Sequence, residues 1–461
     1  MLFNSHVFIF AFLPVAVTGW WMLRRQDARL VWLTLMSYLF YAYWDWRFVS
    51  LMLVSTVIDY TAGLGISRSD VPSVRKRWLV ASLVANLGLL GFFKYSGFFL
   101  ASVAAVCRAA GLDWAVPTLS IILPAGISFY TFQSMSYTID LYRGIVQPAK
   151  SFLHFALYVS MYPQLIAGPI VRYSYIEDQL AELKQRLPAI DLWRGIYFFV
   201  WGLSLKVLVA DTVASYSDRF LSAHETIAFP TSWLAMLGYA YQILFDFDGY
   251  SCMAVGLAFM LGFRMPQNFD SPYKAANPSD FWRRWHITLS EWLRDYLYFA
   301  LGGSRHGLGT TVRNLFLTMF LGGLWHGAGW TFVAWGIFHG ALLGGYHALR
   351  SVNLWPGSRA IGRAITFTGV LFSWVLFRSD DFGMVGNVLS GMFGLHGLES
   401  EHIHLRFYGM LALCFVWTNW GPNAWDLRMT PRRLTAFALA LAFVVSVLML
   451  AKPSPFLYFR F

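Results

Sequence analysis

The sequence predicts an all-α protein that crosses a membrane many times. Of its 461 residues, 57% are hydrophobic and only 13% are charged, whereas soluble proteins carry about a quarter charged residues. The mean hydropathy is +0.51, and apolar runs recur along the whole length. No stretch between these runs is large enough to fold as a soluble domain. We therefore predict one integral-membrane domain over residues 1–461.

Each membrane-spanning helix needs roughly 20 predominantly apolar residues. Candidate spans lie at about 6–23, 30–45, 48–66, 79–105, 117–141, 152–171, 191–210, 231–262, 313–325 with 329–349, 360–378, 405–421 and 433–451. Two basic clusters, Arg24-Arg25-Arg29 and Arg68 with Arg75–Arg77, are separated by two spans, so both are expected in the cytoplasm. No basic region precedes the first span, which argues against a cleavable signal.

The net charge of +11 fits cytoplasmic loops rich in Lys and Arg, and it also suits an anionic cytosolic ligand. No long basic stretch lies outside the spans, which argues against a nucleic-acid partner. Cys107, Cys252 and Cys414 lie in or next to apolar runs without metal or disulfide spacing, so we expect inert core thiols.

Two segments are too rich in proline to be simple spans. Residues 161–175 contain Pro163, Gly168 and Pro169, and residues 261–280 contain three prolines. Proline removes a helical hydrogen bond, and irregular backbone at membrane depth persists only inside protein or beside a water-filled cavity. These segments are predicted to be re-entrant pieces around a cavity.

Residues 277–305 combine many charges with aromatic residues at helical spacing. Asn277 is a plausible N-cap, Pro278 suits the first helical position, and Asp280 and Arg284 have the favoured order for a helix ion pair. The segment is therefore predicted to be one helix. Trp282, Trp285, Leu289, Trp292 and Tyr296 form its apolar stripe.

Two interpretations of this helix remain open. In the first, it is an amphipathic helix in the membrane interface, and His286 is a structural histidine. Alternatively, Arg283, Arg284 and Arg294 hold an anionic ligand while His286 faces the reaction path.

His326 lies among glycines in a run, residues 314–349, that contains no Asp, Glu, Lys or Arg. An ionisable side chain in such a setting is a functional-site hypothesis by default. Fully helical, the run would be about 54 Å long, far more than the roughly 30 Å of the hydrocarbon core. It is therefore expected to break within the glycine-rich stretch 322–329, where a substrate could reach His326.

The alternative for His326 is a histidine that only hydrogen-bonds neighbouring helices. His339 and His347, in the same run, are expected to pack between helices or to lie at the membrane interface. A zinc site is not predicted, because no acidic or cysteine ligand lies near these histidines. The usual hydrolase and phosphate-binding motifs are absent from the sequence.

Several long motifs carry a resemblance that runs nearly end to end. They are MLFNSHVFIFAFLP at 1–14, GISFYTFQSMSYTIDLYRG at 126–144, YPQLIAGPI at 162–170, FDFDGYSCMAVG at 245–256, NFDSPYKA at 268–275, FWRRWHITLSEWLRDYLYFALGG at 281–303 and NLFLTMFLGGLWHGAGWTFVAWGIFHG at 314–340. On these motifs the chain resembles the membrane-bound O-acyltransferase family, in particular its bacterial alginate O-acetyltransferase branch.

The resemblance implies a ring of about 11–12 tilted transmembrane helices, with re-entrant and interfacial helices, around a central funnel. The catalytic core is expected at about 120–350. The two motif histidines of the family fall on His326 and His286, which are the expected catalytic residues. The expected donor is acetyl-CoA, with no tightly bound cofactor and no metal. The resemblance further implies a bacterial inner-membrane location, a periplasmic or membrane-anchored SGNH-type acetyltransferase partner, lipid contact and a polysaccharide acceptor.

We expect His326 to act as general base for an acceptor hydroxyl, with a transient acyl-histidine as the variant mechanism. His286 would orient or polarise the thioester, or relay the proton. Substrate-contact candidates are Arg283, Arg284, Arg294, Trp325, Asp246, Asp248 and Tyr250. Asp248 and Cys252 depart from the family pattern, which has serine and aspartate there; a carboxylate moved four positions stays on the same helix face.

Three functions are distinguished by these observations. A polysaccharide O-acetyltransferase component is favoured by the 126–144 and 314–340 motifs. A related acyltransferase acting on peptidoglycan, teichoic acid, lipid or protein is the alternative. A channel or transporter is disfavoured, because the repeated halves common in transporters are not visible in the sequence.

Overall fold

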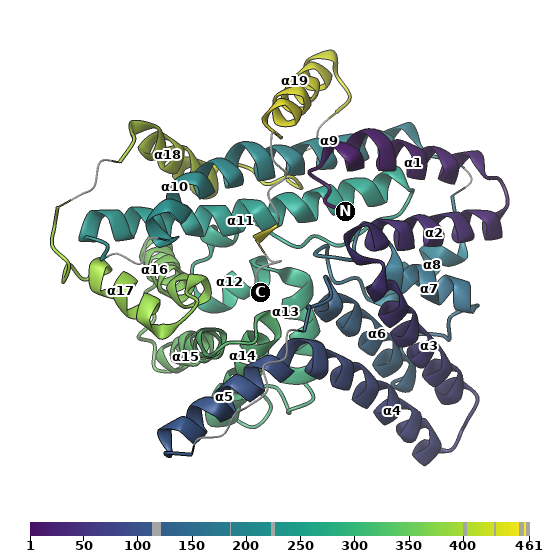
Figure 1. Ribbon diagram of the computed structural model, residues 1–461, viewed down its shortest axis with the longest axis horizontal. Coiled ribbons are helices and arrows are strands. Elements are labelled where there is room, and N and C mark those ends of the chain that lie inside the picture. The colour runs from purple at the N-terminus through teal and green to yellow at the C-terminus, as the bar shows by residue number, and fades with distance from the viewer. Residues whose placement is uncertain are drawn as a thin grey trace. The chain divides into compact units, whose positions relative to one another are not determined.

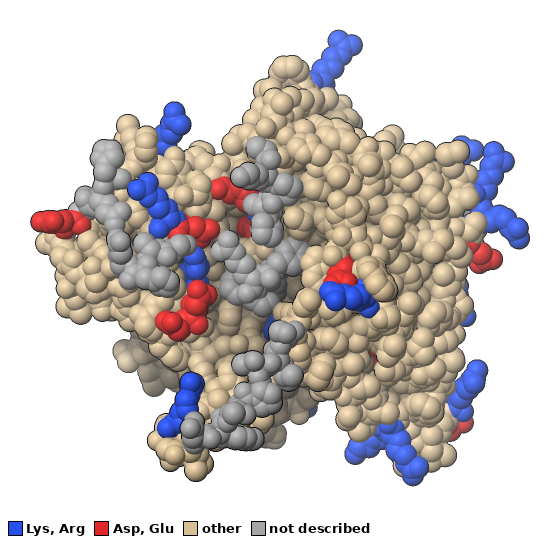
Figure 2. All heavy atoms as spheres, viewed as in Figure 1, with Lys and Arg blue, Asp and Glu red and all other residues tan. Residues whose placement is uncertain are grey.

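The computed structural model describes residues 1–112, 121–184, 186–222, 226–399, 403–427, 430–450 and 456–457, and within these ranges the regular structure is entirely helical (Figure 1). Five helical runs in this described part are long and apolar enough to cross a bilayer: Arg47–Ser67, Pro72–Ala109, Ala189–Leu221, Phe229–Met260 and Arg359–Arg378. Figure 2 shows wide uncharged areas between small groups of Lys and Arg side chains. The predicted all-α, multi-pass membrane fold is confirmed.

The chain divides into two compact units, residues 1–196 with 254–266 and residues 197–253 with 267–461. The first unit contains η1 (Phe8–Phe12), α1 (Leu13–Met22), α2 (Gln26–Asp45), α3 (Arg47–Ser67), α4 (Pro72–Leu90), η2 (Gly91–Tyr95), α5 (Ser96–Ala109), α6 (Ile127–Tyr142), α7 (Phe152–Ser160) and α8 (Tyr173–Ala181). Two long helices, α9 (Ala189–Ser204) and α11 (Phe229–Met260), belong partly to each unit.

The second unit contains the elements that carry most of the candidate residues. They are η3 (Leu205–Ala210), α10 (Asp211–Ser222), η4 (Pro272–Lys274), α12 (Pro278–Arg284), α13 (Ile287–Leu293), η5 (Arg294–Tyr298), α14 (Leu308–His326), α15 (Trp330–Ser351), α16 (Arg359–Arg378), α17 (Phe382–Met392), α18 (Leu405–Trp420) and α19 (Arg433–Met449).

In the first unit, polar side chains hold apolar helices together. The buried Asp59 carboxylate on α3 accepts from Ser82 at 2.6 Å and from Asn86 at 2.7 Å, both on α4. The indoles of Trp20 and Trp21 donate to the carbonyl oxygens of Leu261 and Met260. The last carbonyls of a helix have no partner within it, so these indoles fix where α11 ends.

The predicted irregular segments are confirmed. Between α7 and α8, residues 161–172 form turns and extended backbone, and they are buried apart from Arg172. Residues 261–277 are irregular except for the three-residue η4. α6 begins later than the predicted span 117–141, because Gly126 adopts a left-handed φ of 73° immediately before Ile127. Residues 117–120 of that span lie outside the described residues.

The uncharged run 314–349 breaks within residues 322–329, as predicted from its length. α14 ends at His326, three residues follow, and α15 begins at Trp330, so the two helices form a tightly packed pair. At their contact, Gly323 of α14 faces Gly336 of α15. A Cβ added to Gly336 would lie 2.4 Å from the Met319 carbonyl oxygen, and one on Gly323 would lie 2.4 Å from that of Phe332. Only glycine permits this approach.

The prediction of one continuous helix over 277–305 is wrong. The Asn277 side chain caps α12 as expected, by accepting from the Asp280 N–H at 2.8 Å. The helix then ends at Arg284, and α13 begins only at Ile287, because His286 adopts a left-handed φ of 43°. The five residues of the predicted apolar stripe are nevertheless all buried.

Candidate active site

His326 is the last residue of α14, and its side chain is buried by aromatic rings. Its imidazole lies 4.9 Å from the ring of Trp335 on α15, 5.1 Å from that of Trp325 and 5.4 Å from that of Phe377 on α16, measured between centroids. Only 3% of His326 is exposed. Residues of three helices thus enclose this imidazole among aromatic rings.

His286 is held at the break between α12 and α13 by Asn268, a residue of the irregular segment before α12. Asn268 Oδ1 lies 3.1 Å from His286 Nδ1 and accepts from the Thr288 hydroxyl at 2.9 Å, while its amide donates to Ser251. Because the amide oxygen only accepts, His286 donates through Nδ1–H, which leaves the lone pair on Nε2. Burial lowers the pKa of this imidazole to about 3, so it is neutral at physiological pH.

The backbone explains why this break exists. The segment before α12 pairs with the break itself: the Asp270 N–H donates to the Arg284 carbonyl, and the Ile287 N–H donates to the Asn268 carbonyl, both at 2.9 Å. These two bonds replace helical ones and hold His286 in a left-handed conformation, which non-glycine residues rarely adopt. Such strain persists only where the surroundings impose it.

The two histidines lie on either side of one aromatic ring. The Trp325 ring centroid is 6.1 Å from that of His286 and 5.1 Å from that of His326. Phe247 on α11 contacts His286 from another direction, at 4.7 Å. The fold thus brings the two predicted catalytic histidines and Trp325 into one buried cluster, although their chemical roles stay predictions.

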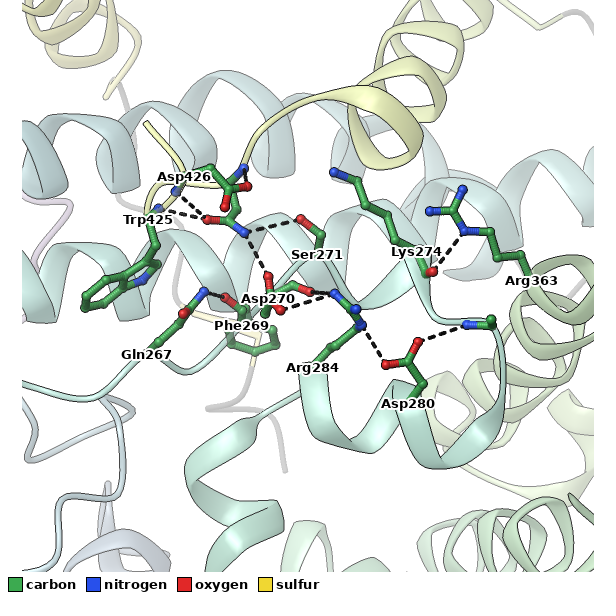
Figure 3. A network of polar contacts seen from close by, with 12 residues as sticks. Gln267, Phe269, Asp270, Ser271, Lys274, Asp280, Arg284, Arg363, Trp425 and Asp426 are labelled. Atoms are coloured by element: carbon green, nitrogen blue, oxygen red, sulfur yellow. Dashed lines mark hydrogen bonds and ion pairs between the residues drawn. The ribbon is translucent and has the colours of Figure 1, made fainter. Parts of the chain in front are cut away.

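The three predicted arginines differ in how their charges are balanced. Arg284 forms ion pairs with Asp280 at 2.9 Å and Asp270 at 3.1 Å (Figure 3), and Arg294 pairs with Asp295 at 2.6 Å. Arg283 is exposed and pairs with no carboxylate in the described part of the chain. Two of the three cations are therefore already neutralised by aspartates.

The candidates on α11 lie in different surroundings. Asp246 pairs with Lys206 of η3 at 2.5 Å and accepts from the Leu457 N–H at 2.7 Å. Asp248 accepts weakly from the Cys252 thiol at 3.5 Å, so the two departures from the family pattern do share a helix face. The Tyr250 ring packs 5.0 Å from that of Phe456.

His339 is a packing residue, as predicted. Its Nδ1 accepts from the Trp282 indole at 3.3 Å, and its Nε2 lies 3.0 Å from the Ser373 hydroxyl. His347 likewise lies 3.4 Å from the Ser279 hydroxyl.

Sequence reasoning missed three contributors to the site: Asn268, Lys206 and Phe456. Asn268 belongs to the quoted NFDSPYKA motif, which was the available signal. Lys206 is a lysine within an apolar run and could have been suspected from its cost in a membrane. No local signal identifies Phe456, whose ring lies 5.3 Å from that of Phe247.

The fold and this cluster define a multi-pass membrane protein with two buried histidines at breaks between helices. Residues 148–351 match the membrane-bound O-acyltransferase family. A probable alginate O-acetylase of Pseudomonas putida is 37% identical in an alignment that covers 100% of both chains. A peptidoglycan O-acetyltransferase of Helicobacter pylori is 38% identical over 87% of this chain and 82% of its own.

A more distant relative is a teichoic acid D-alanyltransferase of Bacillus subtilis, 28% identical over 58% of this chain and 71% of its own. The chain belongs to the membrane-bound O-acyltransferase family. It is a multi-pass membrane acyltransferase.

Proposed function

We propose that this protein takes acetyl groups from cytosolic acetyl-CoA and passes them across the bacterial inner membrane for O-acetylation of an extracellular polysaccharide. A periplasmic or membrane-anchored SGNH-type acetyltransferase completes the transfer. The observation that carries the proposal is the buried pair His286 and His326 around Trp325. The full-length similarity to a probable alginate O-acetylase supports a polysaccharide acceptor.

In the proposed reaction, His326 takes the proton of an acceptor hydroxyl as the oxygen attacks the thioester carbonyl carbon. The carbon–sulfur bond then breaks, the acetyl group stays on the acceptor oxygen, and the thiolate of the donor leaves and is protonated. The aromatic surroundings of His326 support this role, because excluding water limits hydrolysis of the thioester.

The hydrogen bond from His286 to Asn268 helps to decide whether His286 polarises the thioester carbonyl or relays a proton. With Nδ1–H donated to Asn268, Nε2 accepts hydrogen bonds and cannot donate one to a thioester carbonyl. This tautomer favours a proton relay over polarisation of the carbonyl. Asn268 then acts as the positioning residue that selects the tautomer.

A second acceptor, peptidoglycan, is favoured by one specific observation. The Helicobacter pylori relative named for peptidoglycan O-acetylation is as similar to this chain, at 38% identity, as the Pseudomonas putida relative named for alginate, at 37%. The chemistry at His326 would be the same for both acceptors.

The function is tested with purified protein in membrane vesicles, labelled acetyl-CoA outside, and the partner acetyltransferase with polymer inside. We expect label to accumulate in the polymer only when both proteins are present. Solute movement across the vesicle membrane without thioester consumption would instead support a channel or transporter and contradict the proposal.

Replacing His286 with Asn, which also tolerates a left-handed backbone, is expected to lower the transfer rate about 100-fold, a typical loss for a proton-transfer group. The shape of the pH–rate profile between pH 5.5 and 8 should not change. A base whose pKa is lowered takes up its proton only at more acidic pH, so with a pKa of about 3 His286 is neutral throughout this range. Loss of a titration step near pH 6.5 in His286→Asn would contradict this prediction.

A further inference from the structure

A pocket in the second unit has aromatic walls and polar groups of several kinds. Its empty volume, open solvent included, is about 400 Å³. Trp201, Trp417 and Tyr273 supply the aromatic walls, and the Asp248 carboxylate and the Thr418 and Asn423 side chains supply oxygen and amide groups. The Trp201 and Trp417 rings contact each other with centroids 5.6 Å apart and their planes tilted by 44°, so they line adjacent parts of the pocket.

Two cations lie beside this pocket without an acidic partner. Lys274 Nζ donates to the carbonyl oxygen of Gly421, a pocket residue, at 2.6 Å, and Arg363 Nε donates to the backbone carbonyl of Lys274 at 2.9 Å. Within the described residues neither side chain forms an ion pair. Both side chains are only partly buried. They are therefore held by backbone oxygens, and within the described residues neither side chain contacts a carboxylate.

The aspartates nearby are engaged elsewhere. Asp270 and Asp280 bind Arg284, and Asn423 bonds to Asp270 and accepts from the N–H groups of Trp425 and Asp426. In Figure 3, Asp426 lies on one side of Ser271, and Lys274 and Arg363 lie on the other. Lys274 and Arg363 thus differ from Arg284, because they bind backbone carbonyl oxygens and not aspartates.

The pocket lies beside the middle of α11. Leu244, Phe245 and Asp248 of α11 line it, and the Tyr273 hydroxyl donates to the carbonyl oxygen of Ala240 at 2.6 Å. Lys274 directly follows Tyr273, and Arg363, in the second turn of α16, bonds to the Lys274 carbonyl. Both cations therefore lie next to the wall of the pocket that Tyr273 forms.

We infer that the pocket walled by Trp201, Trp417 and Tyr273 binds the nucleotide end of the CoA donor, with its phosphates on Lys274 and Arg363. This inference rests on the proposed function. An adenine ring stacks on aromatic walls, and its exocyclic amino group needs an acceptor such as the Asp248 carboxylate. Phosphates bind cations that are not already neutralised, which Lys274 and Arg363 provide and Arg284 does not.

Binding is measured first, by titration calorimetry of the purified full-length protein in detergent with CoA and with 3′,5′-ADP. Lys274→Met and Arg363→Met should each weaken binding of both ligands about tenfold, as expected for a lost charge-assisted contact. Lys274→Arg keeps the charge and should bind nearly as well. The control is Arg77→Met, at an exposed position of α4, which changes the net charge by the same amount. Its CoA affinity should equal that of the wild type, because salt screens a distant surface charge.

Transfer is measured second, with acetyl-CoA and with acetyl-pantetheine, which lacks the nucleotide. The two methionine variants should raise the KM for acetyl-CoA about tenfold and leave that for acetyl-pantetheine unchanged. A purely structural role of Lys274 at the end of α18 would affect both donors alike.

The inference is overturned if the methionine variants and Arg77→Met bind CoA equally, or if the variants lose affinity only for vesicles containing phosphatidylglycerol, which would identify a lipid headgroup as the ligand. If the variants weaken CoA binding but the wild-type protein transfers no acetyl group, the nucleotide site stands and the proposed function fails. If both donors are used with unchanged KM in every variant, the proposed function stands and the nucleotide site fails.

Discussion

Replacement of His326 with Ala is expected to abolish acetyl transfer while leaving the protein folded and inserted in the membrane. The imidazole is the proposed general base, and loss of such a group costs about 100-fold to 10,000-fold in rate. His326→Gln keeps most of the side-chain volume between Trp325 and Trp335 and should be equally inactive. Transfer is measured with labelled acetyl-CoA, and folding by thermal unfolding in detergent.

The pair of variants separates chemistry from packing. A small residue in place of a buried ring leaves a cavity and lowers stability, so His326→Ala alone could lose activity through unfolding. His326→Gln is the control for that effect. Normal polymer acetylation in a well-folded His326→Gln would refute the catalytic role of the imidazole.

Adding one methyl group at Gly336 is expected to destroy the folded protein. In Gly336→Ala the new Cβ would lie 2.4 Å from the Met319 carbonyl oxygen, which belongs to backbone and cannot move aside. The helices α14 and α15 would be pushed apart. Overpacking costs about 1–3 kcal/mol and occasionally more, and a clash with backbone belongs to the severe end. The shift would also displace His326 at the end of α14.

Gly345 on the same helix provides the matched control, because nothing lies within 4 Å of a Cβ added there. Gly345→Ala should therefore unfold at or slightly above the wild-type temperature, since alanine favours helix over glycine. Yield in the membrane fraction and thermal unfolding are the measurements. If the two variants were equally stable, the close approach of the α14 and α15 backbones at Gly336 would not require glycine, and the prediction would be wrong.

The elements whose boundaries depend on length and polarity could be predicted from the sequence. The break after His326 follows from comparing the length of the uncharged run with the thickness of a bilayer, and α14 does end there. The irregular segments followed from their prolines. The Asp280–Arg284 ion pair followed from helical spacing. In each case the determining information lies within a few turns of chain.

The break at His286 could not be predicted in the same way. Residues 278–298 have helical periodicity throughout, and the interruption comes from backbone bonds to Asn268 and Asp270, which belong to an irregular segment. Tertiary bonds here override local preference, and a single residue in a left-handed conformation leaves no trace in hydrophobic spacing. The strain coincides with a predicted catalytic residue, which is where such conflicts are expected.

Only part of the candidate site could be predicted, because the sequence shows the costly side chains but not their tertiary partners. A histidine in an uncharged run is visible from sequence, because a membrane penalises it. The partners that orient or neutralise such groups are not visible, since Lys206 and Asp246 are far apart in sequence and meet only in the fold. The arginines were identifiable as a basic group, but sequence could not distinguish Arg284, held by two aspartates, from a cation available to a ligand.

The hydrogen bond from the Leu457 N–H to Asp246 constrains how this protein is made. The two residues are 211 positions apart, and Phe456 packs on Phe247, which itself touches His286. During synthesis, the helices that surround His286 enter the membrane long before residues 456 and 457 leave the ribosome. This part of the interior therefore assembles only after residues 456 and 457 have been synthesised.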